Sequence, residues 1–378
     1  MSEAMTAPSM DQETRLEAFG RAVDALRAEV EAELGREDLE HIRGVQTVSN
    51  GLEIAGRVLV HASLEPVSFA VGVAALSAHK ALETMEIGHT VLHGAYDKIE
   101  GSTLSSTRFR WKAPIDEESW RVAHNIKHHQ YTNVADRDPD LDFGGLRLSG
   151  RVKRRLLHRL QPVSNLVTWA GFTSAINLHA TGLLEVYLPG ESNRVLPDRR
   201  WRSLWAAHER FFRKVLRYHG REYVFFPLLA GPLFWKVLLG NALSELARDV
   251  YTGATIYCGH VGARDYPAGS KARGRHEFYL RQVEGSCDFE VPLVVSILCG
   301  GLDRQIEHHL FPRLPPNRLR QIAPRLRAIC EAHGVEYRTG RWSERLREVA
   351  RTLRALGRDA EPKAPSRPSA RRLEPQPA

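Results

Sequence analysis

Long uncharged runs alternate with strongly charged segments along this chain. Residues 161–184 carry no formal charge, and residues 223–244 carry only Lys236. A helix of about 20 apolar residues crosses the hydrocarbon core of a bilayer. The pattern therefore predicts two segments long enough to span a membrane. A buried helical hairpin in a soluble domain is the alternative interpretation.

Three shorter uncharged runs, residues 66–78, 250–262 and 291–302, are typical of buried core helices, partial spans or re-entrant segments.

Basic stretches stand on both sides of residues 161–184, and the positive-inside rule disfavours this arrangement for a single crossing. Either that segment is a re-entrant or interfacial hairpin, or a further span lies nearby. The number of crossings stays open.

Helical periodicity extends over much of the rest of the chain. It predicts charged helical segments at residues 14–39 and 317–354, and helices that end in polar residues at 53–96 and 117–133. Strand signals are sparse. We therefore predict a mainly α fold, a membrane-embedded helical bundle with a cytoplasmic helical cap.

The pattern divides the chain into three parts. Residues 1–52 form a polar and amphipathic helical segment, residues 53–335 form a central domain with transmembrane helices, and residues 336–378 form a charged helix with a Pro- and Arg-rich tail. The compositions of residues 1–12 and 358–378 are typical of disorder.

Charge and cysteine content narrow the class of protein. The formal net charge is +8, from an excess of arginine, and basic stretches beside apolar runs fit an anionic cytoplasmic leaflet. No nucleic-acid motif accompanies the charge, which disfavours nucleic-acid binding. The four cysteines show no CxxC spacing, so they indicate neither a zinc ribbon nor a disulfide framework. The N-terminus lacks the apolar core of a signal peptide.

Seven of the 17 histidines fall in three short windows. The windows contain His89 and His93; His124, His128 and His129; and His308 and His309. Histidines four residues apart lie on one face of an α-helix and can aim at one centre. Adjacent histidines are about 100° apart around the helix, so an HH pair can serve two neighbouring metals.

These clusters favour metal binding over a histidine-rich core held by hydrogen bonds, which does not explain the clustering. Imidazole suits zinc, copper, iron and nickel. A closed structural zinc site needs four ligands, usually with thiolates among them, and the seven imidazoles exceed that need. The sequence therefore predicts two metal ions and oxidative metal chemistry.

The same windows resemble those of the membrane fatty acid desaturase superfamily. The segment HNIKHHQYTN (124–133) followed by DPDL (138–141) is similar to the family's second histidine box and its sequel. QIEHHLFP (305–312) is similar to the third box, in the glutamine variant common among desaturases that act near the carboxyl end of an acyl chain. GHTVLHG (88–94) resembles the first box, and the resemblance covers roughly residues 60–330.

The resemblance implies a di-iron centre, held by histidines at the cytoplasmic membrane surface. The ligands that it implies are His89, His93, His124, His128, His129, His308 and His309. Related desaturases place a histidine or asparagine ligand before the third box, and we expect His260 to fill that role. Gln305, Asp138 and Asp140 are expected to orient ligand histidines through hydrogen bonds. Solvated acids in a turn are the alternative for the two aspartates.

We therefore expect a multi-pass membrane enzyme that desaturates a fatty acyl chain, carried as acyl-CoA or acyl-lipid, with two iron ions (Fe²⁺/Fe³⁺) and O₂. No haem-binding His-Pro-Gly-Gly motif is present, so a separate ferredoxin or cytochrome b5-type carrier is expected to supply the electrons. The alternatives are a hydroxylase, epoxygenase or ketolase of the same superfamily, and a non-catalytic metal-binding membrane protein. Chain length, double-bond position and oligomeric state stay open.

Overall fold

A computed structural model describes residues 10–143, 145–188 and 195–358 of the chain. Within these ranges the regular structure is helical and contains no strand, which confirms the predicted mainly α fold. None of the helices in the described ranges combines the length and the apolar content that a membrane crossing requires. The predicted disorder of residues 1–12 and 358–378 falls largely outside the described residues, although α1 already begins at Met10.

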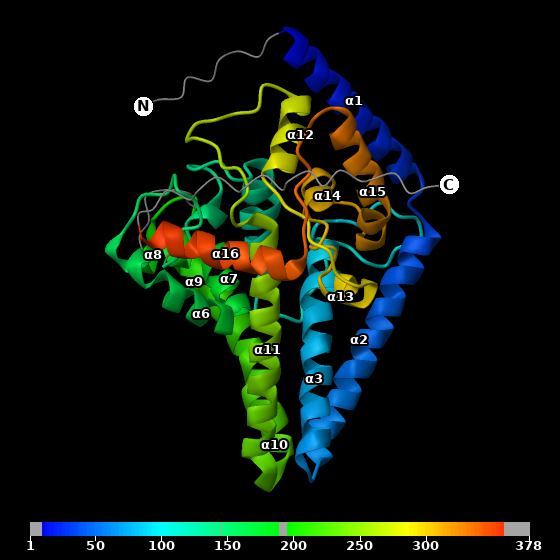
Figure 1. Ribbon diagram of the computed structural model, residues 1–378. Coiled ribbons are helices and arrows are strands. Elements are labelled where there is room, and N and C mark those ends of the chain that lie inside the picture. The colour runs from blue at the N-terminus through cyan, green and yellow to red at the C-terminus, as the bar shows by residue number, and fades with distance from the viewer. Residues whose placement is uncertain (1–9, 144, 189–194, 359–378) are drawn as a thin grey trace.

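The long helices give the molecule its outline (Figure 1). They are α1 (Met10–Ala32), α2 (Arg36–Ala62), α3 (Pro66–Leu82), α9 (Trp201–Gly220), α11 (Phe234–His260), α15 (Pro316–Ala332) and α16 (Trp342–Gly357). Shorter helices fill the body between them: α6 (Gln161–Ala170), α7 (Phe172–Ala180), α8 (Leu183–Tyr187), α10 (Phe226–Leu229), α12 (Arg275–Glu284), α13 (Leu293–Leu298) and α14 (Gln305–Leu310). Residues 14–39, expected as one helical segment, are split between α1 and α2.

Helices α2, α3, α10 and α11 form an arm that projects from the broader body (Figure 1). Gly72 allows α2 and α3 to approach closely, because a Cβ at this position would lie 2.8 Å from Leu59 Cβ. Charges inside the arm are paired: Arg57 donates to Glu222 at 2.6 Å, and Lys80 to Glu245 at 2.7 Å. Such pairing is needed because an unpaired buried charge is costly.

Neither of the two long uncharged runs forms one uninterrupted helix. Residues 161–184 are divided at Gly171 into α6 and α7. Residues 223–244 are interrupted by the short 3₁₀ helix η6 (Gly231–Leu233), which separates α10 from α11. Pro232 lies in this break, and proline lacks the N–H that a continuing helix requires. The prediction that these two runs form segments long enough to span a membrane is therefore not confirmed.

Two π-helical segments stand where the first two histidine clusters lie. The first, η1 (Glu83–His89), continues α3 and leads into α4 (Thr90–Leu92). The second, η2 (Arg121–His128), continues α5 (Glu117–Trp120). Hydrogen bonds in a π-helix join residues five apart, and such segments occur often at functional sites. The prediction that these two histidine clusters lie on regular α-helices is therefore wrong: π-helical turns take the place of α-helical ones at both.

Gly300 holds the loop after α13 against η1. Its φ is +65°, and a Cβ there would lie 2.5 Å from the carbonyl carbon of Met85 and 2.7 Å from the amide nitrogen of Glu86. Both contacts are with backbone atoms, which cannot move aside as a flexible side chain can. The loop therefore fits against η1 only with glycine at this position.

We predict that Gly300→Ala lowers the free energy of unfolding by about 1–3 kcal/mol more than the matched control Gly269→Ala. Gly269 also has a positive φ, +74°, but an added Cβ there would meet nothing within 4 Å. Denaturant unfolding of both variants measures the difference. Equal losses of stability would show that the contact with η1 contributes nothing.

Candidate metal centre

Eight histidines from four segments converge in the body of the protein. They are His89 at the end of η1 and His93 directly after α4, His124 and His128 in η2 with His129 directly after it, His260 at the end of α11, and His308 and His309 in α14. Neighbouring rings lie close together; the centroids of His129 and His309, for example, are 4.4 Å apart. The structure thus brings together all the histidines that the sequence singled out.

The nitrogen atoms fall into two main groups. His89, His93, His124 and His308 form one, and His128, His260 and His309 form the other, with the possible ligand atoms of each group within 4.8 Å of one another. The ring planes of His308 and His309 differ by 89°, so this adjacent pair divides between the groups. His129 lies between them, close to His124 and stacked on His309.

The separations between ring nitrogens fit shared metal ions. Facing Nε2 atoms are 3.2 Å apart in His89 and His93, 3.4 Å in His89 and His124, 3.2 Å in His124 and His129, and 3.3 Å in His260 and His309. With metal–nitrogen bonds of about 2.1 Å, adjacent ligand nitrogens lie roughly 3.0 Å apart in an octahedron and about 3.4 Å apart in a tetrahedron.

Two further nitrogens support the same conclusion. His128 Nε2 and His308 Nε2 are buried without a hydrogen-bond partner among the described residues. A buried polar atom without a partner costs free energy, and a metal ion in each of the two groups would satisfy the atom that belongs to it. The donor set, made of imidazole nitrogens, suits iron, copper or zinc.

Burial keeps most of these histidines neutral. It lowers the pKa of His93, His124, His129, His308 and His309 well below the ordinary value, and the neighbouring histidines lower it further. The neutral imidazole is the form that binds a metal. The site is therefore prepared for a cation without first losing protons from these rings.

Two carboxylates stand behind His128, the one cluster histidine whose pKa rises. Its Nδ1–H donates to Asp138 at 3.0 Å, which leaves Nε2 free to face the centre. Burial lowers the pKa of His128, but Asp138 and Asp140 outweigh this effect and raise it to about 9. Asp140 also accepts a hydrogen bond from His179 at 3.0 Å. The same negative field that favours a proton here favours a metal cation.

Amide and hydroxyl groups orient the other side of the cluster. His309 Nδ1 contacts Gln282 Oε1 at 3.0 Å and Thr132 Oγ1 at 3.2 Å. Gln282 also donates from Nε2 to the carbonyl oxygen of His129 at 3.2 Å. The side-chain amide of Gln305 lies 2.7 Å from His260 Nε2. Gln305 is therefore placed beside a histidine of the cluster.

The sequence did not single out His179, Thr132 or Gln282. His179 is the only titratable residue in the uncharged run 161–184, and an ionisable residue in an apolar segment is a signal of function. The other two residues gave no signal, because Thr132 meets His309 across 177 positions and Gln282 meets His309 across 27, beyond the turns of one helix. Local spacing cannot reveal such contacts.

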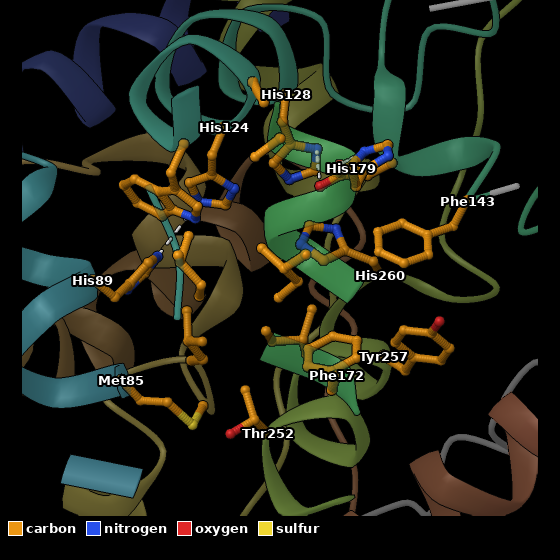
Figure 2. A pocket seen from close by; sticks show the side chains of 18 of the residues that line it. Met85, His89, His124, His128, Phe143, Phe172, His179, Thr252, Tyr257 and His260 are labelled. Carbon is orange, nitrogen blue, oxygen red and sulfur yellow. Dashed lines mark hydrogen bonds and ion pairs between the residues drawn. The ribbon is translucent and has the colours of Figure 1, made fainter. Parts of the chain in front are cut away.

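A cavity of about 120 Å³ lies against the histidine cluster. Figure 2 shows His89, His124, His128 and His260 on its wall, with Met85, Phe172 and Thr252 below them in the view. Ile115, Ile176, Ile256 and Leu302 add further apolar surface to its wall. A cavity with an apolar wall and a polar end suits a hydrocarbon chain that presents one segment to the metal centre.

Comparisons with known proteins agree with this geometry. The sequence model of a family described as "Fatty acid desaturase" matches residues 66–341. The chain is 30% identical to the "NADPH-dependent stearoyl-CoA 9-desaturase" of Mycobacterium tuberculosis (strain ATCC 25618 / H37Rv) over 348 residues, which cover 90% of this chain and 80% of the relative.

Two eukaryotic relatives match over a smaller part. "Delta(8)-fatty-acid desaturase 1" of Arabidopsis thaliana is 28% identical over 273 residues, or 65% of this chain and 52% of the relative. "Fatty acid desaturase 3" of Homo sapiens is 25% identical over 252 residues, or 63% of this chain and 50% of the relative. The chain thus spans about half the length of these two relatives.

We predict that Asp138→Asn reduces metal affinity roughly 10- to 100-fold, because the neutral amide removes the negative charge that supports His128. Titration of the purified protein with Fe²⁺, followed by metal analysis, measures the change. Asp136→Asn is the matched control, since Asp136 accepts a hydrogen bond from the amide of Gly269 and contacts no histidine of the cluster. Unchanged metal affinity in Asp138→Asn would show that the Asp138 carboxylate does not contribute to metal binding.

Proposed function

This chain belongs to the fatty acid desaturase family, and we propose that it removes two hydrogens from a fatty acyl chain at a di-iron centre held by its clustered histidines. O₂ is the oxidant, and a separate carrier supplies two electrons. The substrate loses two hydrogen atoms as its carbon–carbon single bond becomes a double bond. With two further protons, O₂ is reduced to two waters.

The observation that carries this proposal is the cavity, with a largely apolar wall, that lies against the histidines. His89, His124, His128 and His260 form part of its wall, together with apolar side chains such as Phe172 and Ile256. A bound acyl chain would therefore have one of its methylene segments beside the candidate metal ligands. The apolar wall also excludes water from the place where the C–H bonds break.

The ligand set that we propose is the whole cluster: His89, His93, His124, His128, His129, His260, His308 and His309. Iron bound there would supply the oxidising power that an unactivated C–H bond requires. The chain's own residues hold the rings in place. Asp138 fixes His128 through Nδ1, and Gln282 fixes His309 through Nδ1, whereas Gln305 contacts His260 at Nε2, the nitrogen that also faces His309.

Electrons are proposed to come from a ferredoxin or a cytochrome b5-type protein. The sequence shows no haem, flavin or dinucleotide-binding signature of its own. The desaturase of Mycobacterium tuberculosis is named as NADPH-dependent. For this chain we propose that NADPH acts through a reductase and a carrier.

We further propose that the arm formed by α2, α3, α10 and α11 inserts into a lipid bilayer, with the histidine cluster at the cytoplasmic face. Its surface carries many exposed apolar side chains: Val48, Ile54, Val58, Leu64, Val67, Val71, Leu228, Leu229, Leu233, Trp235, Leu239 and Leu243. Exposed apolar surface of this extent marks a contact with a membrane or another protein. Inside the arm, Arg57 and Lys80 are paired with Glu222 and Glu245, while Glu65 at its tip is exposed.

Purified protein supplied with Fe²⁺, a long-chain acyl substrate, O₂, and a carrier with its reductase is expected to form a product two hydrogens lighter, detected by mass spectrometry. NADPH and O₂ without the carrier should give no product. His309→Ala should abolish the product and lower bound iron, because His309 belongs to the three-histidine group. His208 lies on α9 and contacts Tyr187 of α8 at the surface, so His208→Ala is the control that keeps both the product and the bound iron.

Three outcomes would contradict the proposal. A hydroxylated, epoxidised or keto product would assign the chain another reaction on the same kind of centre. Bound iron without any product would indicate that the chain is a non-catalytic metal-binding protein. His260→Ala should lose iron as severely as His308→Ala, and full iron occupancy in His260→Ala would remove His260 from the ligand set.

The double variant Leu64→Arg/Val67→Arg, at the tip of the arm, is predicted to reduce binding to lipid vesicles in flotation assays. Leu64 and Val67 are 96% and 71% exposed, and an arginine near the bilayer centre costs about 2.5–3.5 kcal/mol. Thr103→Arg, in an exposed loop of the body, adds the same side chain as a control. Undiminished flotation of the double variant would place the membrane contact elsewhere.

A further inference from the structure

A second hollow, which we call the solvent-side pocket, reaches the histidine cluster from another side. His129 and His309 lie on its wall, and its volume is about 270 Å³. The cavity proposed for the acyl chain has other histidines on its wall, and among the described residues the two hollows share no lining residue. The cluster therefore stands between two separate hollows.

The wall of the solvent-side pocket joins buried histidines to exposed side chains. His129 and His309 are 5% and 1% exposed, whereas Glu31, Gln130 and Arg313 on the same wall are exposed. Apolar side chains complete the wall, but charged and amide groups reach from the surface to the cluster. The cavity proposed for the acyl chain has instead a largely apolar wall.

Two polar atoms of residues on this wall lack hydrogen-bond partners. His129 turns Nε2 toward His124 at 3.2 Å, and its other nitrogen, Nδ1, is buried without a partner among the described residues. Asn125 donates through Nδ2 to the carbonyl oxygen of Leu92 at 2.9 Å, and its Oδ1 is likewise buried without a partner in that part of the chain. Water in the pocket would satisfy both atoms. The pocket has room for several waters, because each takes roughly 30 Å³ in the liquid.

The position of the solvent-side pocket suits contact with water. Its wall is built from α1, α12, α14 and the residues that follow η2 and α14. Figure 1 shows α1 and α12 at the end of the molecule opposite the tip of the arm. If the arm inserts into a bilayer as proposed, this pocket faces the aqueous side.

A metal ion needs a path with these properties. Moving a cation from water into apolar surroundings is strongly unfavourable unless other groups replace its hydration shell. The solvent-side pocket offers water, the carboxylate of Glu31 and the amide oxygens of Asn125 and Gln130, and divalent cations accept oxygen ligands of these types. Arg27, which donates to Glu31 at 2.7 Å, and Arg313 bring positive charge to the same wall. The pocket therefore lets a cation pass without retaining it.

We propose that the solvent-side pocket is the aqueous entrance of the metal centre, through which hydrated divalent metal ions reach the histidines without crossing the acyl cavity. This inference rests on the metal centre of the proposed function, but not on the reaction. It assigns to the exposed wall residues Gln130 and Arg313 an influence on the rate of metal exchange rather than on metal affinity.

The test measures metal exchange in the full-length apoprotein with Co²⁺, whose histidine complexes absorb visible light. Gln130→Trp/Arg313→Trp narrows the pocket with two indoles. The rate of Co²⁺ uptake should fall at least tenfold, and the rate of Co²⁺ removal by a chelator should fall by the same factor. The Kd should stay within a few-fold of the wild-type value, because a barrier on the path slows entry and exit alike.

Two matched controls separate blockage from other effects. Gln130→Ala/Arg313→Ala removes the same polar groups without filling the pocket, so Co²⁺ uptake should be as fast as in the wild type or faster. Ile176→Trp fills the acyl cavity instead and should leave the uptake rate unchanged.

Glu31→Gln provides an independent measurement if the two indoles disturb the fold, which would lower the unfolding temperature and raise the Kd. This variant removes a negative charge from the pocket with little change of shape. Uptake of Co²⁺ should slow a few-fold at low ionic strength and should match the wild type at high ionic strength, because salt screens exposed charges.

Wild-type uptake rates in both Gln130→Trp/Arg313→Trp and Glu31→Gln would overturn the proposal. Slow uptake in Ile176→Trp alone would place the entrance in the acyl cavity. Absence of Co²⁺ binding to the wild type would contradict the metal centre, and with it both proposals. Slow metal exchange in the Trp variant of a protein that makes no unsaturated product would keep the entrance and contradict only the reaction.

Discussion

The convergence of neutral, buried imidazole nitrogens is the constraint on which the rest of this structure depends. Nitrogens such as those of His89 and His124 face each other at 3.4 Å, although burial and the neighbouring histidines disfavour protonating His124. A pair of neutral imidazoles at this distance can share one N–H···N hydrogen bond, whereas a cation could accept the lone pairs of several rings at once. In either case the helices must deliver eight rings to one place and hold them there.

The surrounding residues supply this rigidity through contacts of different kinds. Carboxylates stand behind His128, amide and hydroxyl groups stand behind His309, and an indole stacks on His124. These supports come from segments that are distant in sequence, so the fold as a whole determines the geometry of the centre. The apolar cavity approaches from one side, where no charged support other than Asp140 lines it.

The sequence was informative where the chemistry is local. The histidine spacing placed each cluster on a helix, and the resemblance of residues 124–133 and 305–312 to known boxes identified the family. It was less informative where contacts are distant: His179 meets Asp140 across 39 positions, and Thr132 meets His309 across 177. The two long runs were predicted as possible membrane spans because they lack charge. In the structure, breaks at Gly171 and Pro232 divide each run into separate helices.

The π-helical turns at residues 83–89 and 121–128 place local backbone stability and ligand geometry in conflict. In η2 the wider turn lets His124 and His129, five residues apart, bring their Nε2 atoms within 3.2 Å. Deleting one residue from this turn would restore the commoner α-helix, yet it would rotate every later side chain by about 100° away from its partners. Selection for a tighter helix and selection for a working centre thus act in opposite directions here.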